Sequence, residues 1–266
     1  QPNAMGGREV GGLANMLAAH MALENAEHRK TVQTFWDSPA IADKVGLKAV
    51  DLFDAIHAGK VKAVWIMATN PVVSLPNANK VREALERCEV VVVSDIRDGT
   101  DTVKLAQIKL PATGWAEKDG TVTNSERRIS RQRGFLPAPG EARADWWMIC
   151  EVAKRLGFSG FDFSGPDAIF DEHARLSATA NNGTRDFDIG ALAGLEKPAY
   201  DALEPIQWPV TAERPQGTER LCTERYYTHN GRARFVPVTQ RAPQNAPDDE
   251  FPFVLNTGRI RDQWHT

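Results

Sequence analysis

The chain has 266 residues, of which 42% are hydrophobic and 25% charged, and its formal net charge is −3. This composition is typical of a folded globular protein with one large or two ordinary domains, and it argues against general disorder. There is no overall positive charge to favour a nucleic-acid partner, and no apolar run reaches the roughly 20 residues of a membrane helix.

The N-terminal stretch is rich in glycine and leads into the first predicted helix. Residues 1–12, QPNAMGGREVGG, hold four glycines, which mark a loop or a place where the backbone approaches something closely. They match neither the dinucleotide fingerprint nor the Walker pattern. The apolar spacing over residues 13–28 then predicts a helix, with Leu13, Leu17, His20 and Met21 on one side.

The clearest pattern lies between residues 62 and 95. Two apolar runs, KAVWIMATNP and EVVVVSD, flank NKVREALERC, whose apolar residues have helical spacing. This pattern predicts two buried parallel strands joined by a helix, with Asn70 and Ser94-Asp95 at the carboxyl ends of the strands. Ligands bind at that edge of open α/β sheets, so these side chains are candidates for holding ribose hydroxyls or a purine edge. The alternative is that they cap the following turns.

A third strand is expected at residues 107–110, followed by a long polar loop and a helix from Asp145 to about residue 156. Asp145 would be the N-cap or a first-turn anion of that helix. The loop carries Lys118 and four arginines at positions 127, 128, 131 and 133, beside turn-forming residues. Such a loop suits phosphate or pyrophosphate, and a solvated basic loop is the alternative.

The remaining sequence predicts a less regular region. Residues 157–211 are rich in Asp, Gly, Asn and Pro and read as a surface excursion with one short helix near 167–176. A hairpin is expected to turn at Asn230-Gly231, before a Pro-rich linker. Phe253-Val254-Leu255 would then begin a strand of a C-terminal domain.

The predicted fold class is therefore α/β, a parallel Rossmann-like sheet flanked by helices. Residues 1–156 would form the central α/β region, 157–245 the irregular excursion and hairpin, and 246–266 the linker and the first strand of a β-rich domain. Because the chain begins at Gln1 without an initiator Met, we expect it to be an internal piece of a longer protein.

Few residues suggest catalysis by themselves. Arg8, beside Gly6-Gly7, could bind a small oxyanion through its planar fork of donors, and the alternative is an ion pair with Glu9 or Glu141. No nucleophile and base pair is recognisable. The three cysteines, at 88, 150 and 222, lie outside any CxxC or Cys/His set, so they are expected to be buried thiols in a reducing compartment, and no metal ligand is expected in this segment.

Six stretches of the sequence, taken together, resemble the molybdopterin oxidoreductases of the dimethyl sulfoxide reductase superfamily. Within that superfamily the chain is most similar to the catalytic subunits of bacterial assimilatory nitrate reductases, and next to the periplasmic type. The resemblance covers the whole chain in order. It rests on QPNAMGGREVGG, WIMATNPVVSLP, VVVSD, WAEKDGTVTNSERRISRQRGFLPAPGEARADWW, NGRARF and LNTGRIRDQWHT.

The resemblance implies a molybdenum ion held by two molybdopterin guanine dinucleotides and one protein ligand. It implies that Asn70 lies beside one dinucleotide, that Ser94-Asp95 hold its nucleotide end, and that Lys118 and Asp145 contact the cofactor. It also implies a cofactor-wrapping loop near the metal, made of Thr257, Gly258, Arg259, Gln263, Trp264, His265 and Thr266.

The implied activity is reduction of nitrate to nitrite, with Arg8 binding the substrate oxyanion. The metal's protein ligand and a 4Fe-4S cluster would belong to a missing N-terminal region, so the fragment alone is expected to be inactive. The electron donor would be a flavoprotein using NADH or a ferredoxin, and the location cytoplasmic. The alternatives are a formate dehydrogenase, a non-catalytic electron-transfer scaffold of the same fold, and a plain nucleotide-binding α/β domain.

Overall fold

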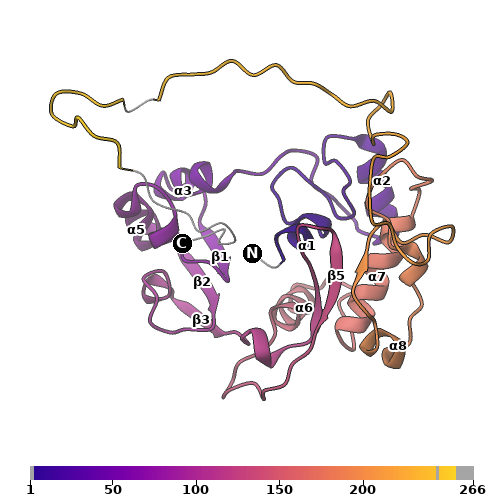
Figure 1. Cartoon of the computed structure of the whole chain (residues 1–266). Coiled ribbons are helices and arrows are strands. Elements are labelled where there is room, and N and C mark those ends of the chain that lie inside the picture. Colours follow the sequence, from indigo (N-terminus) through magenta and orange to yellow (C-terminus); the bar gives the residue numbers. More distant parts are fainter. Residues whose placement is uncertain (1–2, 244–245, 256–266) are drawn as a thin grey trace.

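The structure is a computed structural model that describes residues 3–243 and 246–255. Figure 1 shows two packed regions, one around a parallel sheet and one around α7 and β5, followed by an extended segment. The predicted cofactor-loop residues at 257–259 and 263–266 lie outside the described residues. Among the described residues, no helix combines the length and apolar character needed to cross a membrane.

A three-stranded parallel sheet, in the order β1-β2-β3, forms the first region. Its strands are β1 (Ala63–Met67), β2 (Val90–Asp95) and β3 (Ile108–Pro111). The register pairs Met67 with Ser94 and Asp95 with Pro111, so the three carboxyl ends meet at one edge. This confirms the predicted α/β fold class and its parallel sheet.

Helices α3 (Ala49–His57) and α5 (Ala78–Arg87) pack beside this sheet (Figure 1). The predicted helix between the first two strands is α5, and α4 (Pro71–Ser74) precedes it as a single turn. Val-rich β2 is buried because its side chains enter a core shared with both helices. That core includes Phe53, Ile56, Ile66, Val81, Leu85, Val91 and Val93.

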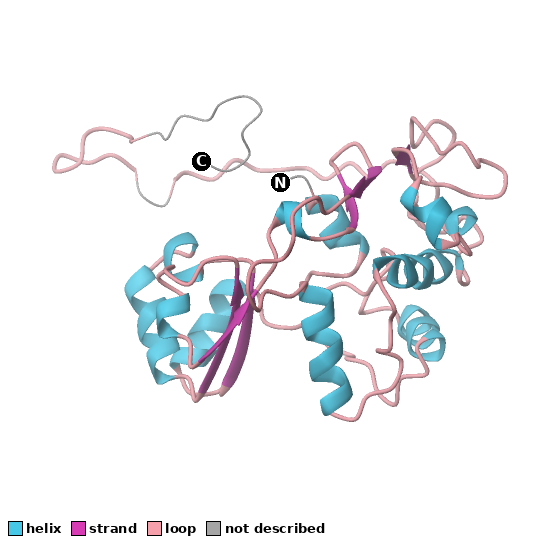
Figure 2. Cartoon of the chain, turned by 90° about the horizontal axis from the view of Figure 1, so that it is seen from below, coloured by secondary structure: helices cyan, strands magenta, loops and turns pink. Residues whose placement is uncertain are grey.

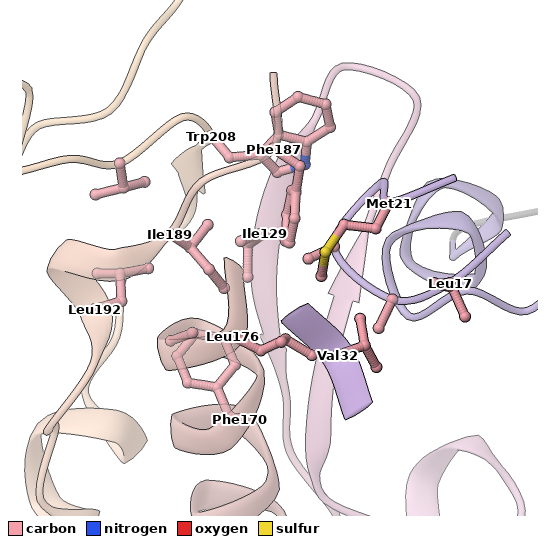
Figure 3. Close-up of a cluster of buried hydrophobic side chains, with 14 of the residues drawn as sticks. Leu17, Met21, Val32, Ile129, Phe170, Leu176, Phe187, Ile189, Leu192 and Trp208 are labelled. Carbon is pink, nitrogen blue, oxygen red and sulfur yellow. The ribbon is translucent and has the colours of Figure 1, made fainter. Parts of the chain in front are cut away.

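The second region is built around an antiparallel sheet of β4 (Gly120–Thr123), β5 (Arg128–Gln132) and β6 (Ile206–Gln207). Its helices come from distant parts of the chain. They are α1 (Ala4–Glu9), α2 (Ala26–Phe35), α6 (Asp145–Arg155), α7 (Pro166–Ala178) and α8 (Lys197–Asp201), with short 3₁₀ turns at Trp115–Glu117 and Gly190–Leu192. A further 3₁₀ turn, Val103–Leu105, packs in the core of the first region. Figure 3 shows that side chains from residues 17–32, 129 and 170–208 meet in one core.

The helix predicted over residues 13–28 is wrong. Residues 13–25 form turns and bends, and a helix begins only at Ala26. Ala19 and His20 have positive φ angles of 56° and 55°, which an α-helix does not allow. Leu17 and Met21 are nevertheless buried, so the apolar spacing correctly indicated which side chains face the core but not the secondary structure that carries them.

The surface excursion expected over residues 157–211 is also wrong as a description of burial. Phe187, Ile189 and Val210 are each 0% exposed, and Trp208 is 2% exposed. The segment completes both the core and the antiparallel sheet, since β6 pairs with β5. The short helix predicted near 167–176 is present as α7. Figure 2 shows the helices of this second region apart from those beside the parallel sheet.

The hairpin expected to turn at Asn230-Gly231 is not formed. Residues 224–238 make a turn, in which the Tyr226 amide donates to the Gly231 carbonyl, but no paired strands. The strand expected to begin at Phe253 would continue past Leu255 into residues that lie outside the described ones, so it stays a prediction.

Candidate functional site

A cavity of about 240 Å³ lies at the carboxyl edge of the parallel sheet. The strand tips form one wall, because the parallel register brings the residues after β1, β2 and β3 to the same place. All five described residues that the sequence predicts as cofactor contacts line it. The lining comprises Ala68, Thr69, Asn70, Ser94, Asp95, Ile96, Ala112, Thr113, Lys118 and Asp145.

The first two strand tips are both held by hydrogen bonds to the segment that follows β2. Asn70 Oδ1 accepts from the Thr102 hydroxyl at 2.6 Å and from the Thr102 amide at 3.3 Å. Asp95 Oδ1 accepts from the Arg97 amide at 3.2 Å. The capping alternative therefore applies to Asp95, whereas the Asn70 side chain makes no cap hydrogen bond to the turn that follows it. The Asn70 amide nitrogen and the second Asp95 oxygen make no hydrogen bond within the described part of the chain.

Ser94 lies deeper than its neighbour Asp95. It is 1% exposed, and its Oγ accepts a hydrogen bond from the Trp65 Nε1–H at 2.7 Å. Its hydroxyl is thus already fixed by β1, and its role is to define the wall of the cavity. Asp95 keeps the more available polar group at the tip of β2.

Lys118 and Asp145 form the opposite wall of the cavity. The Lys118 ammonium donates to Asp145 Oδ2 at 3.2 Å, and Asp145 begins α6 as a first-turn anion, as predicted. Asp145 Oδ1 and Thr113 Oγ1 are buried without a hydrogen-bond partner. Because buried polar groups are nearly always paired, two unpaired oxygens lining the same cavity indicate a place for a polar ligand.

Thr113 was not identified from the sequence. It lies two residues after the end of β3, and its amide donates to the Arg143 carbonyl. The rule that selected Asn70 and Asp95, polar residues after a parallel strand, selects Thr113 as well once β3 is placed.

The four arginines of the 114–133 loop do not line the cavity. Arg127 donates to the carbonyls of Trp208, Thr218 and Glu219, and Arg133 donates to the Asp201 carbonyl. Arginines 128 and 131 bind Gln207 and Asp201. The structure therefore does not place these arginines beside the predicted cofactor contacts. They connect the segment around β5 to residues 200–219, and Lys118 is the residue of this basic group that lines the cavity.

Arg8 lies in the last turn of α1 and is exposed. It does not line the strand-tip cavity. The alternative ion pair with Glu9 is not formed, because the Glu9 carboxylate accepts from Thr123 Oγ1 and Trp208 Nε1 instead. Among the described residues, no carboxylate pairs with Arg8.

A wider hollow, of about 860 Å³, lies elsewhere, among residues 178–227. It contains none of the predicted site residues. Two of its arginines are already engaged: Arg185 donates to the carbonyls of Ser177 and Thr179, and Arg225 to that of Gly183. Size alone therefore does not make it the functional site.

The described residues hold no cluster of three His, Cys, Asp or Glu side chains able to bind a metal. Cys88 and Cys150 are buried as predicted, whereas Cys222 is exposed, contrary to expectation. Burial raises the pKa of the Cys150 thiol, which favours the neutral form.

The molybdopterin oxidoreductase family model matches residues 3–155, which include the whole strand-tip cavity. The chain belongs to the molybdopterin oxidoreductase family. It is 54% identical over its full length to a nitrate reductase of Klebsiella oxytoca and 50% identical to one of Shewanella frigidimarina. It spans 30% and 29% of those two proteins.

More distant relatives differ in name. The chain is 34% identical over its full length to the F420-dependent formate dehydrogenase subunit alpha of Methanocaldococcus jannaschii, of which it covers 37%. Among solved structures, acetylene hydratase from Pelobacter acetylenicus aligns with a TM-score of 0.49 and 19% identity, over 69% of this chain and 23% of that one.

The cavity fits part of the pterin cofactor that a molybdopterin oxidoreductase requires. The unpartnered oxygens of Thr113 and Asp145, the ammonium of Lys118 and the free oxygen of Asp95 supply both donors and acceptors. A phosphate-bearing ligand needs cationic and hydroxyl donors, and a nucleoside needs carboxylate acceptors. The strand-tip cavity has both the cationic and hydroxyl donors and the carboxylate acceptors.

Proposed function

We propose that this chain is part of a molybdenum enzyme that reduces nitrate to nitrite, with molybdenum held by two molybdopterin guanine dinucleotides. The observation that carries the proposal is the 54% identity to a nitrate reductase along the entire chain. The composition of the strand-tip cavity supports it, because the cavity offers groups suited to a phosphorylated nucleoside.

Asp95 is proposed to hold the nucleotide end of one dinucleotide. It lines the strand-tip cavity and also a neighbouring cavity of about 310 Å³, lined in part by Arg97, Asp98 and Lys109. A carboxylate oxygen can accept from a ribose diol or from the N–H groups of guanine. A dinucleotide is long enough to extend past Asp95, and Asn70 and Ser94 would then define its near wall.

Lys118, Asp145 and Thr113 are proposed to contact the same cofactor. The Lys118 ammonium has three donors, of which Asp145 receives one, and the others remain for phosphate oxygens. The Thr113 hydroxyl and Asp145 Oδ1 are buried and unpaired, so a bound ligand would relieve a cost that the empty arrangement bears.

The chemistry depends on the cofactor, and the protein positions the substrate. When bound, the molybdenum cofactor supplies oxygen-atom transfer: nitrate gives up one oxygen and leaves as nitrite, and two electrons with two protons convert that oxygen to water. Arg8 is proposed to bind the nitrate oxyanion, because a guanidinium stays charged at every working pH and offers a planar fork of donors.

We propose further features of the complete enzyme that involve residues outside the described ones. Residues of the loop at 257–266 would contact the cofactor, and an N-terminal region would supply the molybdenum ligand and hold a 4Fe-4S cluster. The electron donor would be a flavoprotein or a ferredoxin, and the enzyme would be cytoplasmic.

Formate oxidation is the second candidate, because a formate dehydrogenase subunit also matches the full chain. The two activities are separated by steady-state kinetics on the full-length, cofactor-loaded protein. We expect reduced viologen to be oxidised by nitrate with a much higher kcat/KM than by chlorate, and formate to support no turnover. Formate oxidation without nitrate reduction would contradict the proposal.

The cofactor site is tested by Asp145→Asn in the same protein, with Asp101→Asn as the matched control. Asp101 pairs with Lys104 outside the strand-tip cavity. We expect Asp145→Asn to lower the molybdenum and guanine dinucleotide content per protein, and Asp101→Asn to leave both unchanged. Equal cofactor content in the two variants would remove Asp145 from the site.

A further inference from the structure

Helix α1, which carries Arg8, is too weak to hold its position by itself. It has six residues, Ala4–Glu9, and includes Gly6 and Gly7. Isolated helices shorter than about 12 residues are marginal in water, and glycine is among the poorest helix formers. The direction of the Arg8 side chain must therefore be set by contacts between α1 and the rest of the protein.

Both ends of α1 are fixed to one residue of β4. The Thr123 amide donates to Asn3 Oδ1 at 2.9 Å, and the Thr123 hydroxyl donates to Glu9 Oε2 at 2.8 Å. Thr123 is 3% exposed, and its bond to Glu9 is buried, whereas its bond to Asn3 is partly buried. Hydrogen bonds to a carboxylate are stronger than those between neutral groups, which makes Glu9 the firmer of the two attachments.

Glu9 has two further attachments, to Trp208 and to Ala19. Its Oε1 accepts from Trp208 Nε1 at 2.5 Å, and its backbone carbonyl accepts from the Ala19 amide at 2.7 Å. The residue is 4% exposed, and burial raises the pKa of its carboxyl. A buried carboxyl is costly, and here its two oxygens join α1 to segments 114 and 199 residues away.

The glycines let α1 and the following loop pack closely enough for these bonds. A Cβ on Gly6 would collide with Asn3 Oδ1, and a Cβ on Gly12 would lie 2.7 Å from the Gly7 carbonyl oxygen. The close backbone approach that the sequence suggested is therefore internal to the protein. It does not by itself mark a ligand.

We propose that Glu9 is a positioning residue that fixes the rotation of α1 and so directs Arg8 toward the substrate; this inference rests on the proposed function. Successive residues of a helix point about 100° apart, since a turn contains 3.6 residues. With Glu9 held inward by Thr123 and Trp208, Arg8 points away from the core, and it is exposed.

The test is a double-mutant cycle in the full-length, cofactor-loaded enzyme, with KM and kcat for nitrate as the readouts. The variants are Glu9→Leu, Arg8→Ala, the two combined, and Glu9→Gln. Gln keeps one acceptor for Trp208 and gains a donor for the Thr123 hydroxyl. We expect Glu9→Leu to raise KM about tenfold with a smaller change in kcat, as Arg8→Ala does, and Glu9→Gln to stay within about threefold of the wild type.

The combined variant decides whether Glu9 acts through Arg8. If it does, the double substitution raises KM no further than Arg8→Ala alone. Multiplication of the two single effects would overturn the inference, and so would an equal loss in Glu9→Gln and Glu9→Leu.

A second pair of variants covers the case in which Glu9→Leu does not fold. Thr123→Val removes the hydroxyl that binds Glu9, and Thr121→Val makes the same change two residues away on β4. A raised KM in Thr123→Val alone, at unchanged molybdenum content, supports the inference, and an unchanged KM overturns it. If the wild-type enzyme turns over formate and not nitrate, the proposed function fails, and the same cycle is measured through the KM for formate.

Discussion

His173 makes the stability of this chain depend on pH in a way that a single substitution can isolate. The residue lies in α7, its ring stacks on that of Phe187 with centroids 5.2 Å apart, and its Nε2 is buried without a hydrogen-bond partner. Burial, with a smaller contribution from His20, lowers the pKa of His173 from 6.5 to about 4. The folded protein therefore resists a proton that the unfolded chain accepts readily.

The direction of the effect follows from this lowered pKa. Above pH 6.5 His173 is neutral in both states and contributes no pH dependence. As the pH falls from 6.5 toward 4, the unfolded chain binds the proton first, and the free energy of unfolding decreases. One pKa unit corresponds to about 1.4 kcal/mol, so the loss at pH 4.5 is about 2 to 3 kcal/mol.

Urea unfolding of the chain, followed by tryptophan fluorescence, measures this loss. We compare the wild type with His173→Gln at pH 7.5 and pH 4.5. Other groups, such as Asp186 and Glu9, titrate in both proteins and cancel in the difference. The wild type should lose about 2 to 3 kcal/mol more than the variant between the two pH values. An equal loss in both proteins would refute the assignment of this pH dependence to His173.

Two further predictions concern stability. Arg131→Met should lower the free energy of unfolding by about 3 kcal/mol, because the Arg131 side chain is 2% exposed, lies 4.0 Å over the Tyr200 ring and binds Asp201. Urea titration would measure this loss, with Arg133→Met, at an exposed arginine, as the control. A loss as small as that of the control would contradict the prediction. Gly11→Ala should lower the free energy of unfolding by more than about 1 kcal/mol, because Gly11 has a φ of +77° and a Cβ there would lie 2.6 Å from Ala18 N. Thermal unfolding would measure this loss, with Gly99→Ala as the control because a Cβ at Gly99 meets open space. Equal melting temperatures of the two variants would contradict the prediction.

The sequence predicted the parallel sheet and most of the candidate site because those features depend on local patterns. The all-apolar run of β2 is a direct record of burial on both faces, and Asn70, Ser94 and Asp95 follow strands whose ends the register must bring together. Lys118 and Asp145 were placed at the site by resemblance, and the structure brings them to the same cavity.

The failures came from contacts between distant residues. Spacing alone cannot distinguish a helix from an irregular segment whose Leu17 and Met21 both face a core, and the positive φ angles of Ala19 and His20 leave no local signal. Likewise, the three acceptors of the Arg127 side chain lie 81 to 92 residues away and are all backbone carbonyls. The sequence alone does not distinguish a solvated basic loop from arginines that donate hydrogen bonds to distant backbone carbonyls.

The pairing of β6 with β5 means that the folded unit extends beyond the segment that the family model matches. The family model ends at residue 155, yet β5 needs Ile206 and Gln207 to complete its ladder, and Trp208 to fill the core and bind Glu9. A piece cut at the end of the family match would expose one edge of β5 and remove the partner of a buried carboxylate. Excision, transplantation or recombination of this region should therefore carry residues through at least Thr218, whose carbonyl receives Arg127.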